Sequence, residues 1–133
     1  MKSQRFGIEI EMTGLTRRSA ALIIAKHFDT GFRHERGVYD TYSVCDQDGR
    51  KWKIVRDASI TPQCGNRFDY DPDYKVEVVS PICHYEDIET IQSIVRELRR
   101  NGHAKVNESC GIHIHVDASK HTARSLRNIA NIM

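Results

Sequence analysis

The sequence lacks several features that would assign it to a class at once. It has no Cys-x-x-Cys pair, no glycine-rich nucleotide loop, and no apolar run near the roughly 18 residues that a membrane helix needs. It also lacks a strong net charge, because 20 basic and 18 acidic residues leave only +2. These absences argue against a zinc ribbon, a Walker-type NTPase, a membrane span, and binding to nucleic acid or membrane driven by charge alone.

Length and cysteine use set the expected class and location. A chain of 133 residues fits a single domain with a sizeable core. Charged residues occur too early at the N-terminus for a secretory signal, so we expect a cytoplasmic location. The cysteine count is even, which leaves disulfides formally open, but without such a signal we expect reduced thiols at Cys45, Cys64, Cys83 and Cys110.

Hydrophobic spacing predicts the secondary structure. Alternation of polar and apolar residues predicts strands at 5–12, 51–57, 74–80 and 111–117. Helical spacing predicts helices at 17–28, with Thr16 as N-cap, and at 86–101. We expect a loop with a short strand (38–44) over 29–50, a long polar loop at 59–73, and the start of a helix at 122–133. Because the strands alternate, they favour an α+β fold in which helices cover one face of an antiparallel or mixed sheet.

The polar faces of these strands carry the residues of chemical interest. In FGIEIEM (6–12), Glu9 and Glu11 share one face, about 7 Å apart, and repel unless solvent, basic neighbours or a cation neutralises them. Glu77 lies on the polar face of a second strand, and His113 and His115 lie on that of a third, followed by Asp117. Each motif alone is typical of a solvated sheet face. If the strands are neighbours, together they predict a site for Mg²⁺ or Mn²⁺, with imidazole favouring Mn²⁺ or Zn²⁺.

Four sequence blocks in this order resemble the amidoligase family: FGIEIE, WKIVRDAS, VEVVSP and CGIHIHVD. That family is related to glutamine synthetase and glutamate–cysteine ligase, and the resemblance covers Phe6 to about Met133. It implies a curved, mainly antiparallel sheet like the catalytic half of glutamine synthetase, which holds divalent cations against the phosphates of ATP. It also implies that 1–133 is the N-terminal portion of an amidoligase-type catalytic domain, because family members continue further. Activity of this chain alone is therefore not assured.

The resemblance implies a role for each matching residue. Glu9, Glu11 and Glu77 would be metal ligands, His113 a metal ligand or phosphate neighbour, and His115 a contact for nucleotide or substrate. Asp57, which we expect to contact the nucleotide, stands where the family writes Asp-Gly-Ser, with Ala58 in place of the glycine. Spacing alone makes Lys53 and Arg56 candidates for phosphate contacts. The implied reaction is ATP-dependent amide or peptide bond formation through an acyl phosphate, with Mg²⁺ or Mn²⁺ as cofactor.

Two other functions stay open from the sequence. A metal-dependent hydrolase could use the same Glu/His face and would bind Zn²⁺ without nucleotide. A non-catalytic binding module derived from a ligase would be indifferent to Glu9→Gln. A Cys110 nucleophile is disfavoured, because Cys110 and His113 fall on opposite faces of a strand. The expected partners are ATP and small-molecule or peptide carboxylates and amines, and an unpaired sheet edge is compatible with a homo-oligomer.

Overall fold

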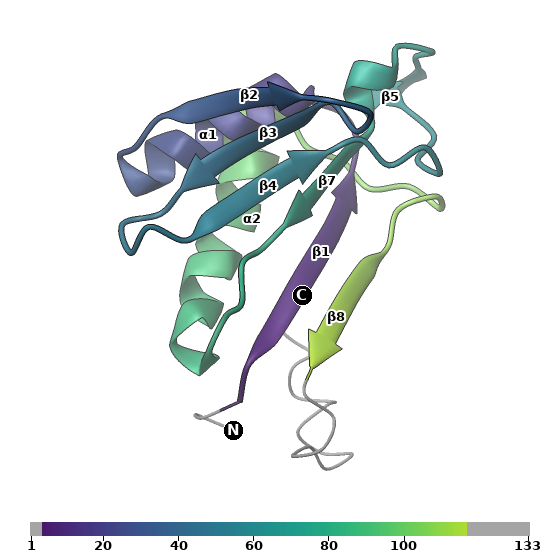
Figure 1. The fold of residues 1–133 in the computed structure, drawn as a ribbon. Coiled ribbons are helices and arrows are strands. Elements are labelled where there is room, and N and C mark those ends of the chain that lie inside the picture. The colour runs from purple at the N-terminus through teal and green to yellow at the C-terminus, as the bar shows by residue number, and fades with distance from the viewer. Residues whose placement is uncertain (1–3, 117–133) are drawn as a thin grey trace.

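The structure is a computed structural model that describes residues 4–116, and its central feature is a six-stranded sheet (Figure 1). The strand order is β2-β3-β4-β7-β1-β8, and each neighbouring pair is antiparallel. The strands are β1 (Phe6–Met12), β2 (Phe32–Arg36), β3 (Thr41–Cys45), β4 (Lys51–Val55), β7 (Val76–Val79) and β8 (Ile112–Val116). A separate small hairpin consists of β5 (Gln63–Cys64) and β6 (Arg67–Phe68).

Two α-helices lie on the same side of this sheet, as Figure 1 shows. They are α1 (Arg17–Phe28) and α2 (Ile88–Gly102), and the short 3-10 turns η1 (Pro72–Tyr74) and η2 (Tyr85–Asp87) lie in the connections. Thr16 caps α1, since its side chain accepts a hydrogen bond from the Ser19 N–H at 3.1 Å. Within the described residues, neither α-helix has the length and apolar content needed to cross a bilayer.

The core lies between these helices and the sheet. Alternate residues of the strands point into it, among them Ile8, Ile54 and Val76. Small residues such as Ala20 and Ala21 allow α1 to lie close to the sheet, and both are fully buried. Burying one such Ile or Val stabilises the fold by about 1.5–3 kcal/mol. In the part of the chain that the structure describes, no helix covers the opposite sheet face, which leaves its polar side chains open to ligands.

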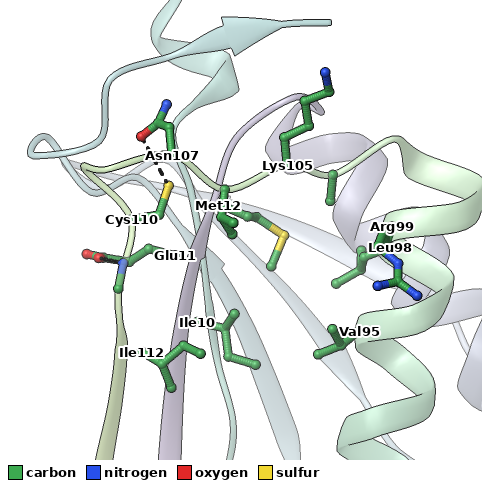
Figure 2. A pocket seen from close by; sticks show the side chains of 13 residues that line it. Ile10, Glu11, Met12, Val95, Leu98, Arg99, Lys105, Asn107, Cys110 and Ile112 are labelled. Carbon is green, nitrogen blue, oxygen red and sulfur yellow. Dashed lines mark hydrogen bonds between the residues drawn. The ribbon is translucent and has the colours of Figure 1, made fainter. Parts of the chain in front are cut away.

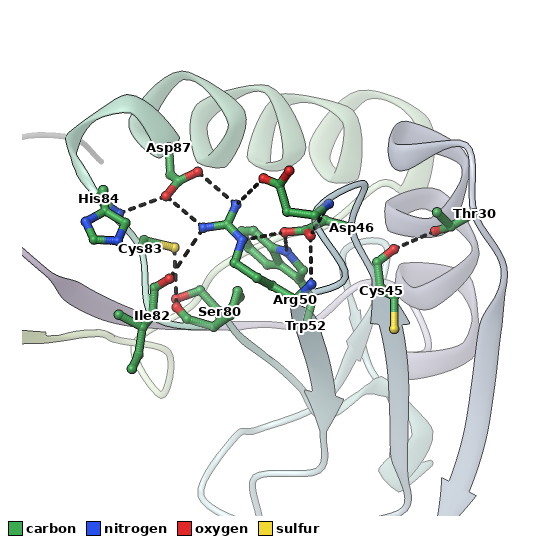
Figure 3. A network of polar contacts seen from close by, with 12 residues as sticks. Thr30, Cys45, Asp46, Arg50, Trp52, Ser80, Ile82, Cys83, His84 and Asp87 are labelled. Carbon is green, nitrogen blue, oxygen red and sulfur yellow. Dashed lines mark hydrogen bonds and ion pairs between the residues drawn. The ribbon is translucent and has the colours of Figure 1, made fainter.

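A network around Arg50 ties the β3–β4 turn to the start of α2 (Figure 3). Its guanidinium donates to both carboxylate oxygens of Asp87 at 2.9 Å and to Asp46 at 3.0 Å. The Asp46 side chain, only 2% exposed, also accepts from the Trp52 indole N–H at 3.1 Å. Burial acts to raise the pKa of Asp46, but the hydrogen bonds from Trp52 and the Arg50 backbone outweigh it and lower that pKa. The network anchors β4, which carries part of the open face.

The sequence predicted most of the elements. The helix at 17–28 and its Thr16 cap are confirmed, and the four strands are confirmed with slightly shorter bounds. The second helix begins at Ile88, after η2, and ends at Gly102. The segment 122–133 and Asp117 lie outside the described residues.

The prediction for 29–50 was incomplete. It missed β2, because FRHER is largely exposed and shows no apolar alternation. The predicted strand at 38–44 is displaced: residues 37–40 form a turn in which Gly37 and Asp40 have positive φ, and β3 begins at Thr41. The predicted loop at 59–73 also contains the β5–β6 hairpin, whose strands are too short to show a pattern.

Candidate metal centre on the open sheet face

The order of the strands brings the predicted acidic and imidazole side chains together. β1 lies between β7 and β8, so its polar face has neighbours on both sides. Glu11 is the cross-strand partner of Glu77, and Glu9 is the partner of His113. Partners in an antiparallel pair project from the same face of the sheet. Residues that are about a hundred positions apart in the chain therefore form one surface.

Two groups of side chains are close enough to hold a cation. The potential ligand atoms of Glu9, Glu77 and His113 all lie within 4.8 Å of one another. Those of Glu11, Asp57 and Glu77 do so as well, which makes Glu77 common to both groups. Carboxylate oxygens with one imidazole are a ligand set that suits Mn²⁺ or Mg²⁺, and also Zn²⁺. The residues present therefore fit one or two divalent cations.

Glu9 lies between the two histidines of β8. Its Oε2 atom is 3.3 Å from His115 Nε2 and 3.4 Å from His113 Nδ1. His113 and His115 are 56% and 69% exposed, so both imidazoles remain accessible to a ligand above the sheet. The contacts orient the Glu9 carboxylate toward the exposed side of the face.

The Glu11 carboxylate is held in place by a backbone N–H group. Its Oε1 accepts a hydrogen bond from the Gly111 N–H at 2.7 Å, and the residue is only 5% exposed. A Cβ atom at position 111 would lie 3.3 Å from this oxygen, which is tighter than an ordinary contact. Glycine at position 111 thus allows β8 to approach the Glu11 carboxylate closely.

The crowding of carboxylates shifts their pKa values. Burial, together with the charges of Glu9 and Asp57, raises the pKa of Glu77 to about 7. A hydrogen bond shared with Asp57, and burial, raise the pKa of Glu11, whereas the same hydrogen bond lowers the pKa of Asp57. With a pKa of about 7, Glu77 is only partly ionised near neutral pH unless a cation replaces its proton. This answers how two glutamates are tolerated on one strand face.

Asp57 has a larger part in this geometry than the sequence indicated. We had predicted it as a nucleotide contact, yet it belongs to the second ligand group. It follows β4, and its Oδ1 accepts from the Ser59 N–H and hydroxyl at 2.9 and 2.7 Å. This turn aims its carboxylate at Glu11 and Glu77. The sequence signal was only an aspartate directly after a strand, which is common in loops.

The two predicted phosphate contacts lie in different surroundings. Lys53 is exposed on the open face, where it is the partner of Val79, and Val79 is in turn the partner of Glu9. Arg56 instead donates to the Val38 carbonyl at 2.8 Å and so holds the β2–β3 turn. Of these two residues, only Lys53 therefore lies in register with the acidic groups.

A cavity of about 560 Å³ lies between α2 and the strands β1 and β8, and Glu11 and Gly111 are part of its wall (Figure 2). Apolar side chains dominate its wall, including Ile10, Leu98 and Ile112. Cys110 also lines it, and its thiol lies 3.7 Å from Asn107 Oδ1 and forms no hydrogen bond with an imidazole of residues 4–116. The structure shows all four cysteines as free thiols. We place the candidate centre on the open face instead, because the charged ligand groups converge there.

One of three comparisons with known proteins found a match. A family model described as "Putative amidoligase enzyme" matches residues 2–133, which is nearly the whole chain. Comparison with curated proteins and with solved structures gave no match. The family match includes every strand that carries the acidic and imidazole side chains. The chain therefore belongs to the amidoligase family, a family described as enzymes of the ligase type.

Proposed function

We propose that this chain carries the cation-binding sheet of an ATP-dependent carboxylate–amine ligase. The observation that carries the proposal is Glu77, which two groups of metal-ligating side chains share on an open antiparallel sheet. Membership of the amidoligase family supports it. In this proposal the sheet corresponds to the catalytic half of a glutamine-synthetase-like fold, and 1–133 is a portion of the catalytic domain.

The proposed cofactor is Mg²⁺ or Mn²⁺. Glu9, Glu77 and His113 would hold one cation, and Glu11, Asp57 and Glu77 a second. A bound cation would neutralise the phosphate oxygens of ATP as charge shifts during phosphoryl transfer. The raised pKa of Glu77 supports this role, because a carboxylate crowded by others gains most from a bound cation.

The proposed reaction has two steps. A carboxylate oxygen of the acid substrate attacks the γ-phosphorus of ATP, and ADP leaves with the electrons of the broken P–O bond. An amine then attacks the carbonyl carbon of the acyl phosphate, and phosphate leaves as the amide or peptide bond forms. Lys53 would contact phosphate oxygens, and the exposed His115 would contact nucleotide or substrate. The substrates would be small-molecule or peptide carboxylates and amines.

The test is a calorimetric titration of Mg²⁺ and Mn²⁺ with and without a non-hydrolysable ATP analogue. We expect nucleotide to bind only when the cation is present, and Glu77→Gln to abolish this binding. Glu89→Gln, which changes an exposed glutamate on α2, serves as the matched control and should bind as the unaltered protein does. Nucleotide binding that ignores both the cation and Glu77→Gln would contradict the proposal.

One observation favours a second function. The imidazole of His113 among the ligands of the first group also suits Zn²⁺, which would activate water in a metal-dependent hydrolase. Tight Zn²⁺ binding without any effect of nucleotide would favour that function. If no divalent cation bound at all, a non-catalytic binding module would be the better description.

A further inference from the structure

A line of cross-strand partners runs over the open face from the metal centre to the far edge of the sheet. Glu9 pairs with Val79, Val79 with Lys53, Lys53 with Ser43, and Ser43 with Arg33. All five side chains therefore belong to the same face. This line has an acidic end on β1 and a basic end on β4 and β2.

The two basic side chains of this line, Arg33 and Lys53, form no ion pair within the described residues, although Glu35 lies close enough to Arg33 to feel its charge. In residues 4–116, neither Arg33 nor Lys53 forms an ion pair or donates a side-chain hydrogen bond, and both are exposed. Their neighbour Lys51 differs, because its Nζ lies 3.2 Å from Glu35 Oε1. The hydrogen bond from Lys51, aided by Ser43 and by the charge of Arg33, lowers the pKa of Glu35. Since Glu35 and Lys51 neutralise each other, Arg33 and Lys53 leave this end of the face positive.

The spacing of the strands allows the side chains of Lys53 and Arg33 to contact a single ligand group. Neighbouring strands are about 4.8 Å apart, so Lys53 lies roughly 10 Å from β1, and Arg33 lies roughly 10 Å beyond Lys53. Long flexible side chains can converge from that separation on one ligand above β3, where Ser43 itself is only 6% exposed. An arginine binds carboxylate or phosphate with two parallel hydrogen bonds, and a lysine adds a compact charge.

We propose that Arg33 and Lys53 form an oxyanion subsite beside the metal centre. The subsite takes a carboxylate or phosphate group at the end of a ligand whose other end reaches the cations at Glu9 and Glu77. The source of that group, acid substrate or nucleotide, rests on the proposed ligase function. Oxyanion binding at Arg33 and Lys53 does not, because it needs neither cation nor nucleotide.

The experiment measures the binding of two probes to protein freed of divalent cations on a chelating resin, because dissolved EDTA would bring carboxylates of its own. Tripolyphosphate represents the phosphate of a nucleotide, and glutarate represents the carboxylate of a substrate. Calorimetry gives the affinities, and the backbone amide NMR signals of Ser43 and Lys53 report the position. We expect one probe to bind at these strands and to lose about tenfold in affinity in Arg33→Gln and in Lys53→Gln.

Two further variants separate a built subsite from general attraction to basic surface. Arg67→Gln removes an exposed arginine from β6, away from this line, and should leave probe affinity unchanged. Arg33→Lys keeps the charge but loses the paired N–H donors of the guanidinium, so we expect a probe affinity between those of the unaltered protein and Arg33→Gln. The proposal would be overturned if Arg33→Gln bound the probe as tightly as the unaltered protein does. It would also be overturned if Arg33→Gln and Arg67→Gln lost probe affinity equally.

The two probes also distinguish the sources and the two proposals. Preference for tripolyphosphate supports a phosphate as the occupant, and preference for glutarate supports a carboxylate. Probe binding that Arg33→Gln weakens, in a protein that binds no nucleotide with Mg²⁺ or Mn²⁺, would sustain the subsite while the ligase proposal fails. Suppose instead that nucleotide binds only with a cation, and that neither Arg33→Gln nor Lys53→Gln changes the affinity of either probe. The ligase proposal would then stand and the subsite would fail.

Discussion

Glu77 on β7 lies directly across from Glu11 on β1, and the ligand oxygens of both lie within 4.8 Å of Asp57. The same Glu77 reaches Glu9 and His113 on its other side. One carboxylate thus joins the two halves of the candidate centre. Replacing it should affect both halves, whereas replacing an outer residue should affect one.

Glu77→Gln is therefore expected to lower cation affinity more than Glu9→Gln does. Glu9→Gln leaves the group of Glu11, Asp57 and Glu77 intact, so that one cation should still bind. We expect Glu77→Gln to lower cation affinity at least about a hundredfold. Residues that only hydrogen-bond to a metal ligand typically cost 10–100-fold when mutated, and Glu77 would contact the cation directly. Titration of Mn²⁺, followed by calorimetry, measures this. Equal losses in the two variants would contradict a shared ligand.

The metal-free protein should become less stable as the pH rises from about 4.5 to about 7. The pKa of Glu77 is raised to about 7 in the folded state, above the usual value of about 4.3 in an unfolded chain. The folded protein then binds the extra proton, and stability is lost as the pH rises through the folded pKa. Partial exposure screens the effect, so we expect about 1–2 kcal/mol.

Thermal unfolding in EDTA at several pH values checks this dependence. Glu77→Gln should flatten the curve in this range and should be more stable than the unaltered protein at pH 8. Saturating Mg²⁺ or Mn²⁺ should reverse the trend for the unaltered protein, because a bound cation favours ionised ligands. A curve for Glu77→Gln that is parallel to that of the unaltered protein would assign the pH dependence to other groups.

Gly111→Ala should weaken cation binding with little loss of stability. The added Cβ would lie 3.3 Å from Glu11 Oε1 and 3.9 Å from His113 Nε2, so the Glu11 carboxylate must move. Gly7→Ala on β1 is the matched control, because its Cβ would meet no atom within 4 Å. The comparison uses cation affinity by calorimetry and the unfolding midpoint in urea. An effect on affinity of equal size in both variants would contradict a specific role for Gly111.

Asp46→Ala is expected to destabilise the fold by about 2–4 kcal/mol, because it leaves the Arg50 and Trp52 donors without their acceptor. Asp48→Ala is the control, since Asp48 is 80% exposed and lies 3.8 Å from the same guanidinium. Urea unfolding measures both. The pKa of Asp46 is lowered, so its contribution is present above pH ~4 and is lost as the pH falls through the folded pKa. A small, pH-independent difference would contradict this account.

Some features follow from neighbouring residues in the chain, and sequence spacing predicts them well. The alternation in FGIEIEM places Glu9 and Glu11 opposite the core, because the side chains of any strand alternate between two faces. The helix at 17–28 follows from Thr16 as N-cap and from apolar residues on one face. The family resemblance supplied the grouping of Glu77 and His113 with these glutamates, which spacing alone left conditional on the order of the strands.

Other features depend on contacts between distant residues, and the tertiary structure is needed to see them. The sheet order makes β7 and β8 the neighbours of β1, and the turn after β4 brings Asp57 to Glu11 and Glu77. β2 shows no pattern of its own, and it forms because its backbone pairs with β3. Long-range pairing adds hydrogen bonds and burial that no local window contains. Local spacing therefore determines which face each charged side chain occupies, and the packing of the strands determines which of them meet.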